Sequence, residues 1–384
     1  MLLPSQPISS ALSQRLDLRR EAGLLRQLRT ADNLVDFCSN DYLGLARSPA
    51  LRAAIQQADA DWATVRTGAT GSRLLAGQTD LANEVEQELA QLYKTETALI
   101  FNSGYDANIG LLACLPQAGD TLLTDELIHA SMIDGARLSY ATRQRFRHND
   151  LAHLETLLRS AAESAGQVFV AVESLYSMDG DLAPLRALTN LCEQYGAVLL
   201  VDEAHATGVY GPNGEGLVVA LGLQERVFAR VHTFGKALGV HGAAVVGSAL
   251  LRDYLINFAR PFIYSTALPP HSLLAIRCAH KQLRIQSASR QQLQDRLRLF
   301  RQLVTDQLPG STWTDSLSPI QCLIVPGNEQ ARRVAQQAQG AGFDVRAILS
   351  PTVPVGQERL RICIHAFNTE TEITRLVEIL AGHL

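Results

Sequence analysis

The chain has 384 residues, and 34 Lys plus Arg against 38 Asp plus Glu give a formal net charge of −4. This length predicts two domains, and a hydrophobic content of 47% excludes intrinsic disorder as the main state. The slightly acidic balance lacks the basic surface that binds a phosphate backbone, so nucleic acid is not expected as a partner. Lysine is scarce: it occurs only at Lys94, Lys236 and Lys281, so any lysine chemistry has three candidates.

The six cysteines are widely spaced and form no C-x-x-C pair, which indicates a reducing compartment rather than a disulfide framework. The longest stretch without Asp, Glu, Lys or Arg is Pro261–Ile276, and its 16 residues are short of the roughly 20 that span a bilayer. The N-terminus lacks the basic start and apolar core of a signal peptide. We therefore expect a cytoplasmic protein without a membrane partner.

In chain order, the first expected element is an amphipathic helix over Ile8–Arg29, where apolar residues recur at helical spacing among charged ones. Short apolar runs follow, separated by helical segments and polar turns. Several runs lack strict alternation, as strands covered on both faces do, so an α/β domain with a mainly parallel sheet is predicted. The expected strands are Thr97–Phe101, Thr121–Thr124, Val168–Val172, Ala197–Val201, Val227–Thr233 and Ala243–Ser248, and the helices include Leu81–Tyr93, Leu151–Ala165 and Leu185–Tyr195.

The C-terminal part has a different pattern. A polar helix is expected first, followed by a strand, a helix, a proline-rich loop and a last strand, over Lys281–Leu308, Ile320–Val325, Glu329–Ala341, Ser350–Gly356 and Arg359–His365. This change predicts a domain boundary near residue 280. The expected parts are an N-terminal helix and arm (1–45), a large α/β domain (46–280) and a small α+β domain (281–384).

Three common cofactor and metal motifs are not matched. The only Gly-Lys pair, Gly235-Lys236, has Arg230 where a phosphate-binding P-loop needs Gly and Ala237 where it needs Ser or Thr. No G-x-G-x-x-G follows a strand, which argues against dinucleotide binding. No H-E-x-x-H or paired-thiolate pattern argues for zinc, so no metal is expected.

The strongest chemical pattern lies at the ends of two expected strands. The run Val198–Val201 leads into Asp202 and, three residues later, His205, and another strand leads into Lys236. Ligands bind at the carboxyl ends of parallel strands. Pyridoxal phosphate needs a lysine that bonds to its aldehyde and an aspartate that keeps its pyridine nitrogen protonated. Singly, Asp202 could cap a helix and Lys236 could be a solvated loop charge, but together they favour this cofactor.

Three further turns follow expected strands. Asn102–Asn108 opens an apolar helix, so its backbone N–H groups can bind an anion, although such turns often merely cap a helix. His129 follows the strand at Thr121–Thr124, where a lone histidine is more often structural. Ser177 follows Val168–Val172, where the simplest interpretation is a turn residue.

Seven motifs, taken in order, make the chain similar to the α-oxoamine synthases, which are fold-type I pyridoxal-phosphate enzymes that condense an amino acid with an acyl-CoA and release CO2. The similarity covers nearly the whole chain. It implies the aminotransferase-like fold type I, with a mainly parallel seven-stranded sheet in the large domain and a smaller α+β C-terminal domain. The motifs are Ser39-Asn40-Asp41-Tyr42-Leu43-Gly44-Leu45, Asn102-Ser103-Gly104-Tyr105, His129-Ala130-Ser131, His148-Asn149-Asp150, Ser177-Met178-Asp179-Gly180, Val201-Asp202-Glu203-Ala204-His205 and Thr233-Phe234-Gly235-Lys236.

The resemblance implies a role for each matched residue. Lys236 would bond to the cofactor aldehyde, Asp202 would pair with the pyridine nitrogen, His205 would contact the ring oxygen, and His129 would stack on the ring and meet the substrate; these four form the implied catalytic set. Further cofactor contacts are implied for Gly104, Tyr105, Ser177, Thr233 and, across the interface of an obligate homodimer, Ser265 and Thr266. Substrate contacts are implied for Arg26, Asn40, Thr352 and Arg361, whose planar guanidinium suits a carboxylate.

A second set of motifs narrows the implied reaction. Gly239–Ala244, Ile263–Thr266, Pro351–Pro354 and Arg359–Arg361 resemble the family members that join L-alanine to a pimeloyl thioester, carried on CoA or a carrier protein, in biotin synthesis. Gly68–Gly77 is shared by several subgroups and does not help to choose among them. A sister synthase using glycine or serine with another acyl-CoA stays an alternative, and a non-catalytic cofactor-binding protein a remote one. Because the chain as a whole attracts no anion, CoA phosphates would need a local cluster of arginines.

Overall fold

The computed structural model describes residues 7–28, 30, 33–62, 66–163, 165–285 and 287–383. The chain divides into two compact units, Met1–Leu34 and Val35–Leu384, and each is described by itself. Among the helices in these ranges, none has both the length and the apolar character needed to cross a bilayer.

The first unit contains one helix, α1 (Pro7–Glu21). The expectation that a helix continues to Arg29 is wrong for the described residues, and Arg29 itself lies outside them. Gly23 has φ of +65°, a left-handed conformation that commonly ends helices. Arg26 therefore follows the helix rather than lying on it.

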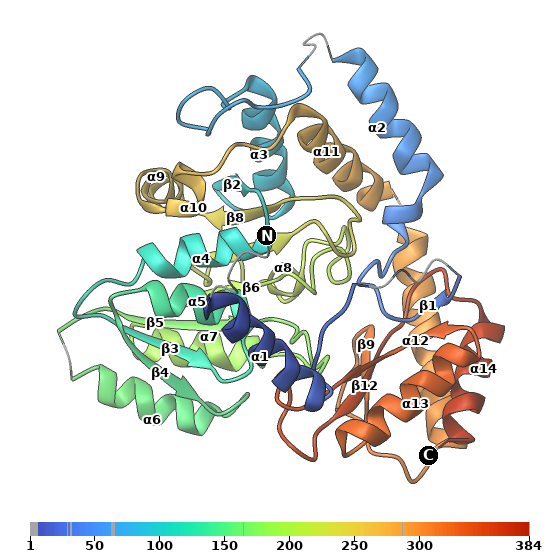
Figure 1. Cartoon of the computed structure of the whole chain (residues 1–384). Helices are drawn as coiled ribbons and strands as arrows, with labels where there is room; N and C mark the ends of the chain where they lie inside the picture. The colour runs from blue at the N-terminus through green and yellow to red at the C-terminus, as the bar shows by residue number, and fades with distance from the viewer. Residues whose placement is uncertain are drawn as a thin grey trace, which may run out of the picture. The chain divides into compact units, whose positions relative to one another are not determined.

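The second unit is built on a seven-stranded sheet with the order β2-β8-β7-β6-β5-β3-β4 (Figure 1). Strand β8 runs antiparallel to both of its neighbours, β2 and β7, and the other adjacent strands of this sheet are parallel. The predicted mainly parallel sheet and the α/β fold class are therefore confirmed. The carboxyl ends of the other six strands share one edge. The strands are β2 (Thr97–Phe101), β3 (Thr121–Asp125), β4 (Thr142–Phe146), β5 (Val168–Glu173), β6 (Val198–Asp202), β7 (Ala229–Thr233) and β8 (Ala243–Gly247).

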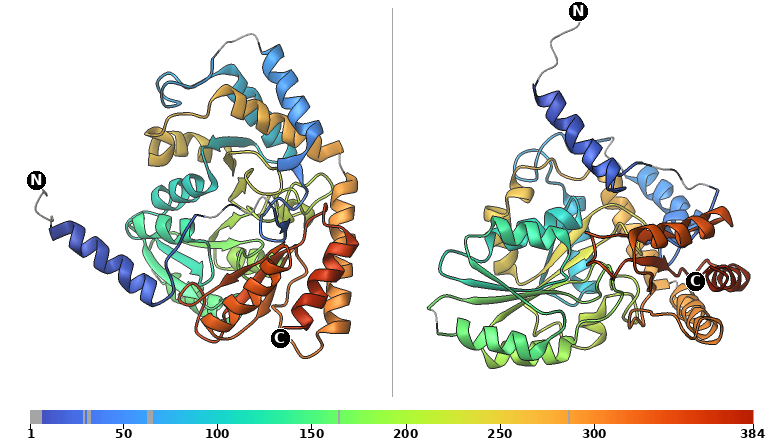
Figure 2. Two further views of the ribbon diagram at one scale, coloured as in Figure 1. Left: turned by 45° about the vertical axis from the view of Figure 1, so that its right-hand side comes forward. Right: turned by 60° about the horizontal axis from the view of Figure 1, so that its bottom comes forward.

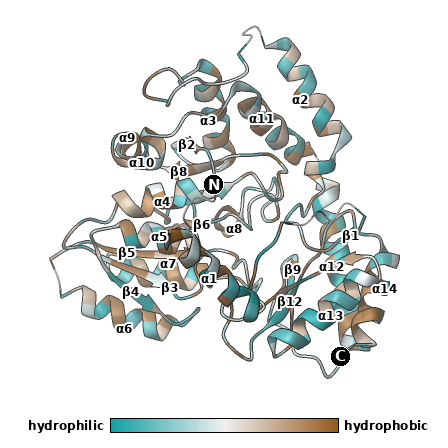
Figure 3. Cartoon of the chain, viewed as in Figure 1, coloured by the Kyte–Doolittle hydropathy of each residue, from teal (hydrophilic) through white to brown (hydrophobic). Residues whose placement is uncertain are grey.

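Helices cover both faces of this sheet. One face packs against α4 (Gly104–Cys114), α5 (Ala130–Leu138), α9 (Ala249–Phe258) and α10 (Arg260–Ile263), and the other against α6 (Leu151–Ala161), α7 (Leu185–Gln194) and α8 (Leu217–Ala220). Near β2 and β8, a third apolar cluster includes α2 (Pro49–Asp61), α3 (Asp80–Leu92) and α11 (Pro270–Ile285). Burial on both faces explains why the central strands are continuous apolar runs, which are mostly brown in Figure 3.

Strand β4 was not expected from the sequence. Its residues, Thr142 to Phe146, are polar except the last, and its side chains are mostly exposed. It pairs only with β3, at the edge of the sheet, where charged side chains also discourage pairing with another molecule.

The C-terminal part contains a three-stranded antiparallel sheet ordered β11-β12-β9, with helices packed beside it (Figure 2). The helix expected over Lys281–Leu308 corresponds to the end of α11 and to α12, which lie on either side of residue 286, a position outside the described residues. The domain boundary near residue 280 stays a prediction. One apolar cluster contains residues from both sides of it, among them Phe234 and Ile362. The elements are η1 (Leu45–Arg47), α12 (Ser287–Gln307), β9 (Ile320–Ile324), α13 (Asn328–Gly340), β11 (Arg346–Ile348), β12 (Arg359–Cys363), α14 (Glu370–Ala381) and the short parallel pair β1 (Val35–Asp36) and β10 (Phe343–Asp344).

Candidate active site

The predicted site residues Asp202 and Lys236 lie at the same edge of the central sheet. Asp202 is the last residue of β6, and Lys236 follows the end of the neighbouring parallel strand β7 by three residues. Burial lowers the pKa of Lys236 to about 8, although the carboxylates of Asp202 and Glu173 oppose this shift. The amine is therefore partly deprotonated near neutral pH, as a proton acceptor requires.

The loop that carries Lys236 is fixed by a close approach of two backbones. Gly239 has φ of +66°, and a Cβ added there would stand 2.2 Å from the backbone nitrogen of Ala46. Only glycine fits both constraints without strain.

A chain of hydrogen bonds joins Asp202 to His129. Asp202 accepts from the backbone of Ala204 at 2.7 Å and from Asn108 Nδ2 at 2.7 Å. Asn108 also donates to Ser131 Oγ at 3.0 Å, and this hydroxyl lies 2.7 Å from His129 Nδ1. Asp202 is 4% exposed, so these donors keep a buried carboxylate satisfied while leaving further acceptor capacity.

Glu173 is a second buried carboxyl group at this edge, and the sequence reasoning missed it. It ends β5 in register with Asp202 on β6, and it is 2% exposed. Within the described part of the chain, its Oε1 has no hydrogen-bond partner. Burial and the Asp202 charge raise the pKa of Glu173 well above its usual value. The available signal in the sequence was a glutamate directly after the apolar run of β5, the strand that pairs with the strand of Asp202.

The turn between β2 and α4 lies where the sequence predicts an anion site, and the binding of an anion there stays a prediction. Ser103 caps α4 by accepting a hydrogen bond from the backbone of Asp106, which leaves other N–H groups of the first turn without an intrahelical partner. A Cβ at Gly104 would stand 3.3 Å from Thr233, so α4 begins directly beside the end of β7. Tyr105 is exposed, and its hydroxyl donates to Asp134.

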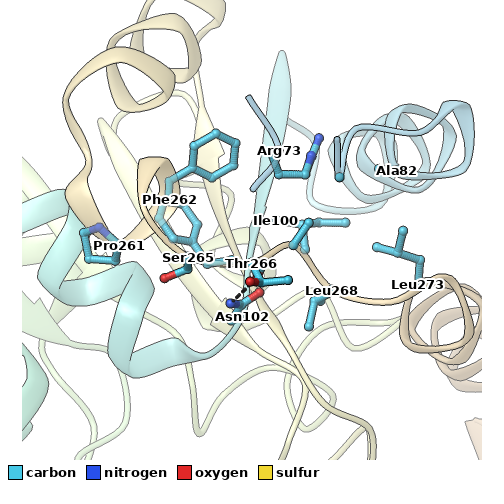
Figure 4. A pocket seen from close by; sticks show the side chains of 13 residues that line it. Arg73, Ala82, Ile100, Asn102, Pro261, Phe262, Ser265, Thr266, Leu268 and Leu273 are labelled. Carbon is cyan, nitrogen blue, oxygen red and sulfur yellow. Dashed lines mark hydrogen bonds between the residues drawn. The ribbon is translucent and has the colours of Figure 1, made fainter. Parts of the chain in front are cut away.

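Ser265 and Thr266 lie beside this turn in the same chain (Figure 4). The side chain of Asn102 donates to the carbonyl of Thr266 at 2.9 Å, and these three residues line a cavity of about 20 Å³. Thr266 is exposed and Ser265 half-buried. Their expected contact with a partner subunit's cofactor stays a prediction.

A second hydrogen-bond chain runs from His205 to Arg361. His205 Nδ1 lies 2.8 Å from the Tyr42 hydroxyl, which lies 3.1 Å from Asn40 Oδ1. Arg361 Nη2 donates to the same Asn40 oxygen at 3.0 Å. The structure therefore brings together two expected substrate residues, Asn40 and Arg361, and links them to the expected cofactor residue His205.

The loop after β5 joins the central sheet to the C-terminal sheet at the site. Arg361 Nε donates to the carbonyl of Ser177 at 2.8 Å, and Ser316 Oγ donates to the carbonyl of Gly180 at 2.8 Å. A Cβ at Gly180 would stand 2.2 Å from the carbonyl oxygen of Ile320. The two expected ligand residues Ser177 and Arg361 thus hold each other in place.

His148 anchors the same loop from the other side. Its Nδ1 lies 3.0 Å from Asp125 Oδ1 and its Nε2 lies 2.7 Å from Asp181 Oδ2. Burial alone would lower the pKa of His148, but the two carboxylates raise it to about 10. A protonated imidazole donates to both, so it ties the end of β3 to the loop that carries Ser177.

Two expected substrate residues are not brought into these networks. Thr352 is exposed in the loop between β11 and β12, and no side-chain hydrogen bond from it to the other candidate residues is observed in this part of the chain. Arg26 belongs to the first unit. Both roles stay predictions.

A hollow of about 340 Å³ lies between α5 and the exposed edge of the sheet. Its lining includes Arg137 on α5 and Arg143 and Arg145 on β4, together with Ile128, Ile133, Ala136 and Thr124. Ile128 directly precedes His129. In the sequence, Arg143 and Arg145 stand two residues apart in a polar segment. The strand geometry places their side chains on the same face of β4.

The arrangement fits pyridoxal phosphate. The fit rests on a buried, donor-held carboxylate, an amine of lowered pKa on the adjacent strand and an open helix N-terminus that Thr233 reaches. In the described ranges, by contrast, no group of three His, Cys, Asp or Glu side chains could hold a metal ion.

Comparisons with known proteins agree with this chemistry. The family described as aminotransferase class I and II matches residues 32–380. The chain is 43% identical to an 8-amino-7-oxononanoate synthase of Emericella nidulans, covering 95% of this chain and 93% of that protein, and 41% identical to one of Cellvibrio japonicus, covering 98% and 95%.

Solved structures are similar over the same extent. A serine palmitoyltransferase from S. paucimobilis, with a bound PLP–myriocin aldimine, has a TM-score of 0.87 and 28% identity, covering 97% of this chain and 96% of that one. An 8-amino-7-oxononanoate synthase from Francisella tularensis has a TM-score of 0.78 and 30% identity, covering 91% and 98%.

The His148 anchor gives a prediction about stability and pH. The folded protein keeps the imidazole proton to about pH 10, whereas an unfolded histidine loses it near 6.5. The stabilisation is therefore complete below about pH 6.5 and is lost as the pH rises towards 10. We expect His148→Gln to lower the Tm by about 2–5 °C at pH 6, with the difference from the native chain disappearing by about pH 10.

The control for this measurement is His271→Gln, which changes an exposed histidine. Thermal unfolding of all three cofactor-free proteins would be followed from pH 6 to 10. A Tm difference that stays constant over this range would show that the ring proton of His148 does not stabilise the loop.

Proposed function

The chain belongs to the aminotransferase class I and II family, and within it we propose that it is a pyridoxal-phosphate-dependent acyltransferase of the α-oxoamine synthase group. Its reaction is the decarboxylative condensation of L-alanine with a pimeloyl thioester, which yields 8-amino-7-oxononanoate, CO2 and a free thiol for biotin biosynthesis. The observation that carries this function is the convergence of Asp202, Lys236 and Arg361 on one site in a chain about 40% identical, over nearly its full length, to named synthases.

The cofactor is pyridoxal phosphate, which supplies an electron sink for the electrons of the substrate Cα when it is bound. Asp202 pairs with its ring nitrogen, because Asn108 and Ala204 hold the carboxylate in one orientation. His205 would contact the ring oxygen, and His129 would stack on the ring. Gly104, Tyr105, Ser177 and Thr233 complete the contacts from this chain.

Lys236 moves the proton at the substrate Cα. Its amine has a pKa of about 8, low enough to accept this proton and to return it at a later step. The Asp202 and Glu173 charges keep the pKa from falling further, so the amine can still hold a proton at neutral pH.

Arg361 binds the carboxylate of alanine. Its orientation is fixed by the Ser177 carbonyl and by Asn40, at 2.8 and 3.0 Å. A guanidinium held in this way offers a carboxylate a defined geometry. Arg26, Thr352 and His129 are proposed as further substrate contacts.

The arginine-lined hollow receives the phosphates of the acyl carrier, whether CoA or a carrier protein. Arg143 and Arg145 are exposed on the edge strand, and the apolar part of the lining includes Ile133 and Ile128, which directly precedes His129. Guanidinium groups are the preferred partners of phosphate. This hollow provides the local basic cluster that a chain of net charge −4 needs for such a ligand.

The working unit is proposed to be a homodimer in the cytoplasm, with Ser265 and Thr266 reaching the phosphate of the other subunit's cofactor. The exposed position of Thr266 beside the β2–α4 turn supports this arrangement. The proposed domains are an arm over 1–45, a large domain over 46–280 and a small domain over 281–384.

One alternative is a sister synthase, such as a 2-amino-3-ketobutyrate CoA ligase or an autoinducer or sphingoid-base synthase. The 28% identity to serine palmitoyltransferase favours it less than the 43% identity to an 8-amino-7-oxononanoate synthase. A non-catalytic cofactor-binding protein is a remote alternative, because Arg361 would then have no carboxylate to bind.

The first prediction concerns Lys236. Lys236→Ala should abolish the borohydride-sensitive absorbance of the covalent lysine–cofactor adduct and lower kcat by at least about 10²–10⁴-fold. Lys94→Ala, which changes an exposed lysine in a turn, is the control and should behave as the native chain. Retention of the absorbance in the Lys236 variant would refute the assignment.

The second prediction concerns the substrates. Thiol release would be measured with L-alanine, glycine and L-serine against pimeloyl-CoA, pimeloyl carrier protein, acetyl-CoA and palmitoyl-CoA. Alanine with a pimeloyl thioester should give the highest kcat/KM. A higher kcat/KM for glycine with acetyl-CoA, or for serine with palmitoyl-CoA, would contradict our proposal and support a sister synthase.

The third prediction concerns the arginine-lined hollow. Arg143→Ala should raise the KM for pimeloyl-CoA roughly tenfold, the expected loss of one charge-assisted contact, and leave the KM for alanine unchanged. Arg159→Ala on α6, an exposed arginine outside the hollow, is the control. An unchanged thioester KM in the Arg143 variant would contradict the placement of the phosphates.

A further inference from the structure

The turn that follows β6 is held by a side chain of the neighbouring strand. This turn, Glu203–Thr207, carries His205. Thr207 is 1% exposed, and its hydroxyl donates to the carbonyl oxygen of Glu203 at 2.7 Å. The same hydroxyl lies 2.8 Å from Nδ1 of His232, which belongs to β7. A single buried hydroxyl therefore joins the turn to the next strand of the sheet.

The directions of these two hydrogen bonds follow from the available protons. A threonine hydroxyl has one proton, and a backbone carbonyl oxygen can only accept, so the proton of Thr207 is used by Glu203. The hydroxyl oxygen then accepts from His232, whose Nδ1 must carry a proton. Burial and the nearby charge of Arg230 lower the pKa of His232 well below its usual value. The ring is therefore neutral, with its one proton on Nδ1.

The imidazole of His232 is itself held in place. It is completely buried, and it stacks on the ring of Tyr93 with centroids 3.8 Å apart and planes 18° from parallel. Tyr93 is also completely buried and directly follows α3. Because both rings are packed, the Nδ1–H group of His232 has a defined direction towards Thr207.

The carbonyl of Glu203 is the centre of the turn. It accepts from the backbone of Ala206 at 3.0 Å and of Thr207 at 2.8 Å, in addition to the threonine hydroxyl. The N–H group of Glu203 donates to the carbonyl of Val231 on β7 at 2.8 Å. The turn is thus attached to β7 twice, through the backbone of Val231 and through the side chain of the next residue, His232.

We propose that Thr207 and His232 are positioning residues that fix the turn carrying His205 to the strand that leads to Lys236. The inference deepens the proposed function and rests on it for the roles of His205 and Lys236. These two residues would meet the ring oxygen and the aldehyde of the cofactor, which stand on adjacent ring carbons. Their side chains must therefore keep one separation, and the attachment of the turn to β7 maintains it.

A buried threonine hydroxyl that bonds four residues back along the chain is, by itself, an ordinary feature of helices. Thr189 on α7 is an example, since it is completely buried and its hydroxyl donates to the carbonyl of Leu185. What distinguishes Thr207 is its second contact, with a side chain from another strand. The two threonines therefore form a matched pair for a test.

The test is Thr207→Val, with Thr189→Val as the matched control. Valine keeps the shape of threonine and removes the hydroxyl, so both variants should lower the Tm. Only Thr207→Val should raise the dissociation constant for pyridoxal phosphate, by about tenfold, and shift the pH midpoint of the cofactor absorbance. Thr207→Ser keeps the hydroxyl and should restore the native dissociation constant.

A second measurement depends neither on the cofactor nor on the folding of the valine variant. Nitrogen-15 spectra of the cofactor-free native protein with labelled histidine, assigned by comparison with His232→Asn, should show His232 protonated on Nδ1. Protonation on Nε2 alone would overturn the inference. So would a folded Thr207→Val variant with native cofactor affinity, or equal changes of affinity in the Thr207 and Thr189 variants.

These outcomes separate this inference from the proposed function. A native protein that binds no pyridoxal phosphate would contradict the proposed function, while the nitrogen-15 spectra would still report the proton that joins His232 to Thr207. A protein that binds and uses the cofactor normally after the loss of the Thr207 hydroxyl would contradict only the positioning role.

Discussion

Two carboxyl groups and one amine share the buried carboxyl edge of the central sheet, and the charge of each depends on the other two. Glu173 and Asp202 are adjacent in register on β5 and β6, and Lys236 follows the next strand. Three separate ionised groups could not be desolvated here without large cost, so the pKa of Glu173 rises and that of Lys236 falls. Asp202 accepts hydrogen bonds from the Asn108 side chain and from the Ala204 backbone, both at 2.7 Å.

Neighbouring elements contact this edge from two sides. On one side, α4 and α5 supply Asn108 and Ser131. On the other, the C-terminal sheet reaches over the loop after β5, where Arg361 meets Ser177. Because the loop is also tied to β3 through His148, a shift of the small sheet would disturb the segment that carries Ser177.

Much of the fold and the chemical centre could be predicted from the sequence, for a physical reason. Strands buried on both faces must be continuous apolar runs, so β6 and β7 were visible, and polar residues directly after them stood out. Asp202 and Lys236 were found in this way. The polar edge strand β4 had no such signature, and the helix end at Gly23 depended on a backbone conformation rather than on periodicity.

The residues that support the centre were harder to predict. Tyr42 and His205 are far apart in the chain, as are Asn108 and Asp202, and only the packing of α4 and the segment after β1 brings them together. A buried tyrosine or asparagine looks the same in the sequence whether it fills space or holds a functional group.

Helix α4 has one more consequence for what can bind. Its first residue, Gly104, borders the proposed anion site, and Asn108, four residues later, donates to the carboxylate of Asp202. Four residues of α-helix advance by about 6 Å, and this length cannot change without breaking backbone hydrogen bonds. In the proposed function, the helix therefore sets one fixed distance between the group that binds the phosphate and the group that holds Asp202 towards the ring nitrogen.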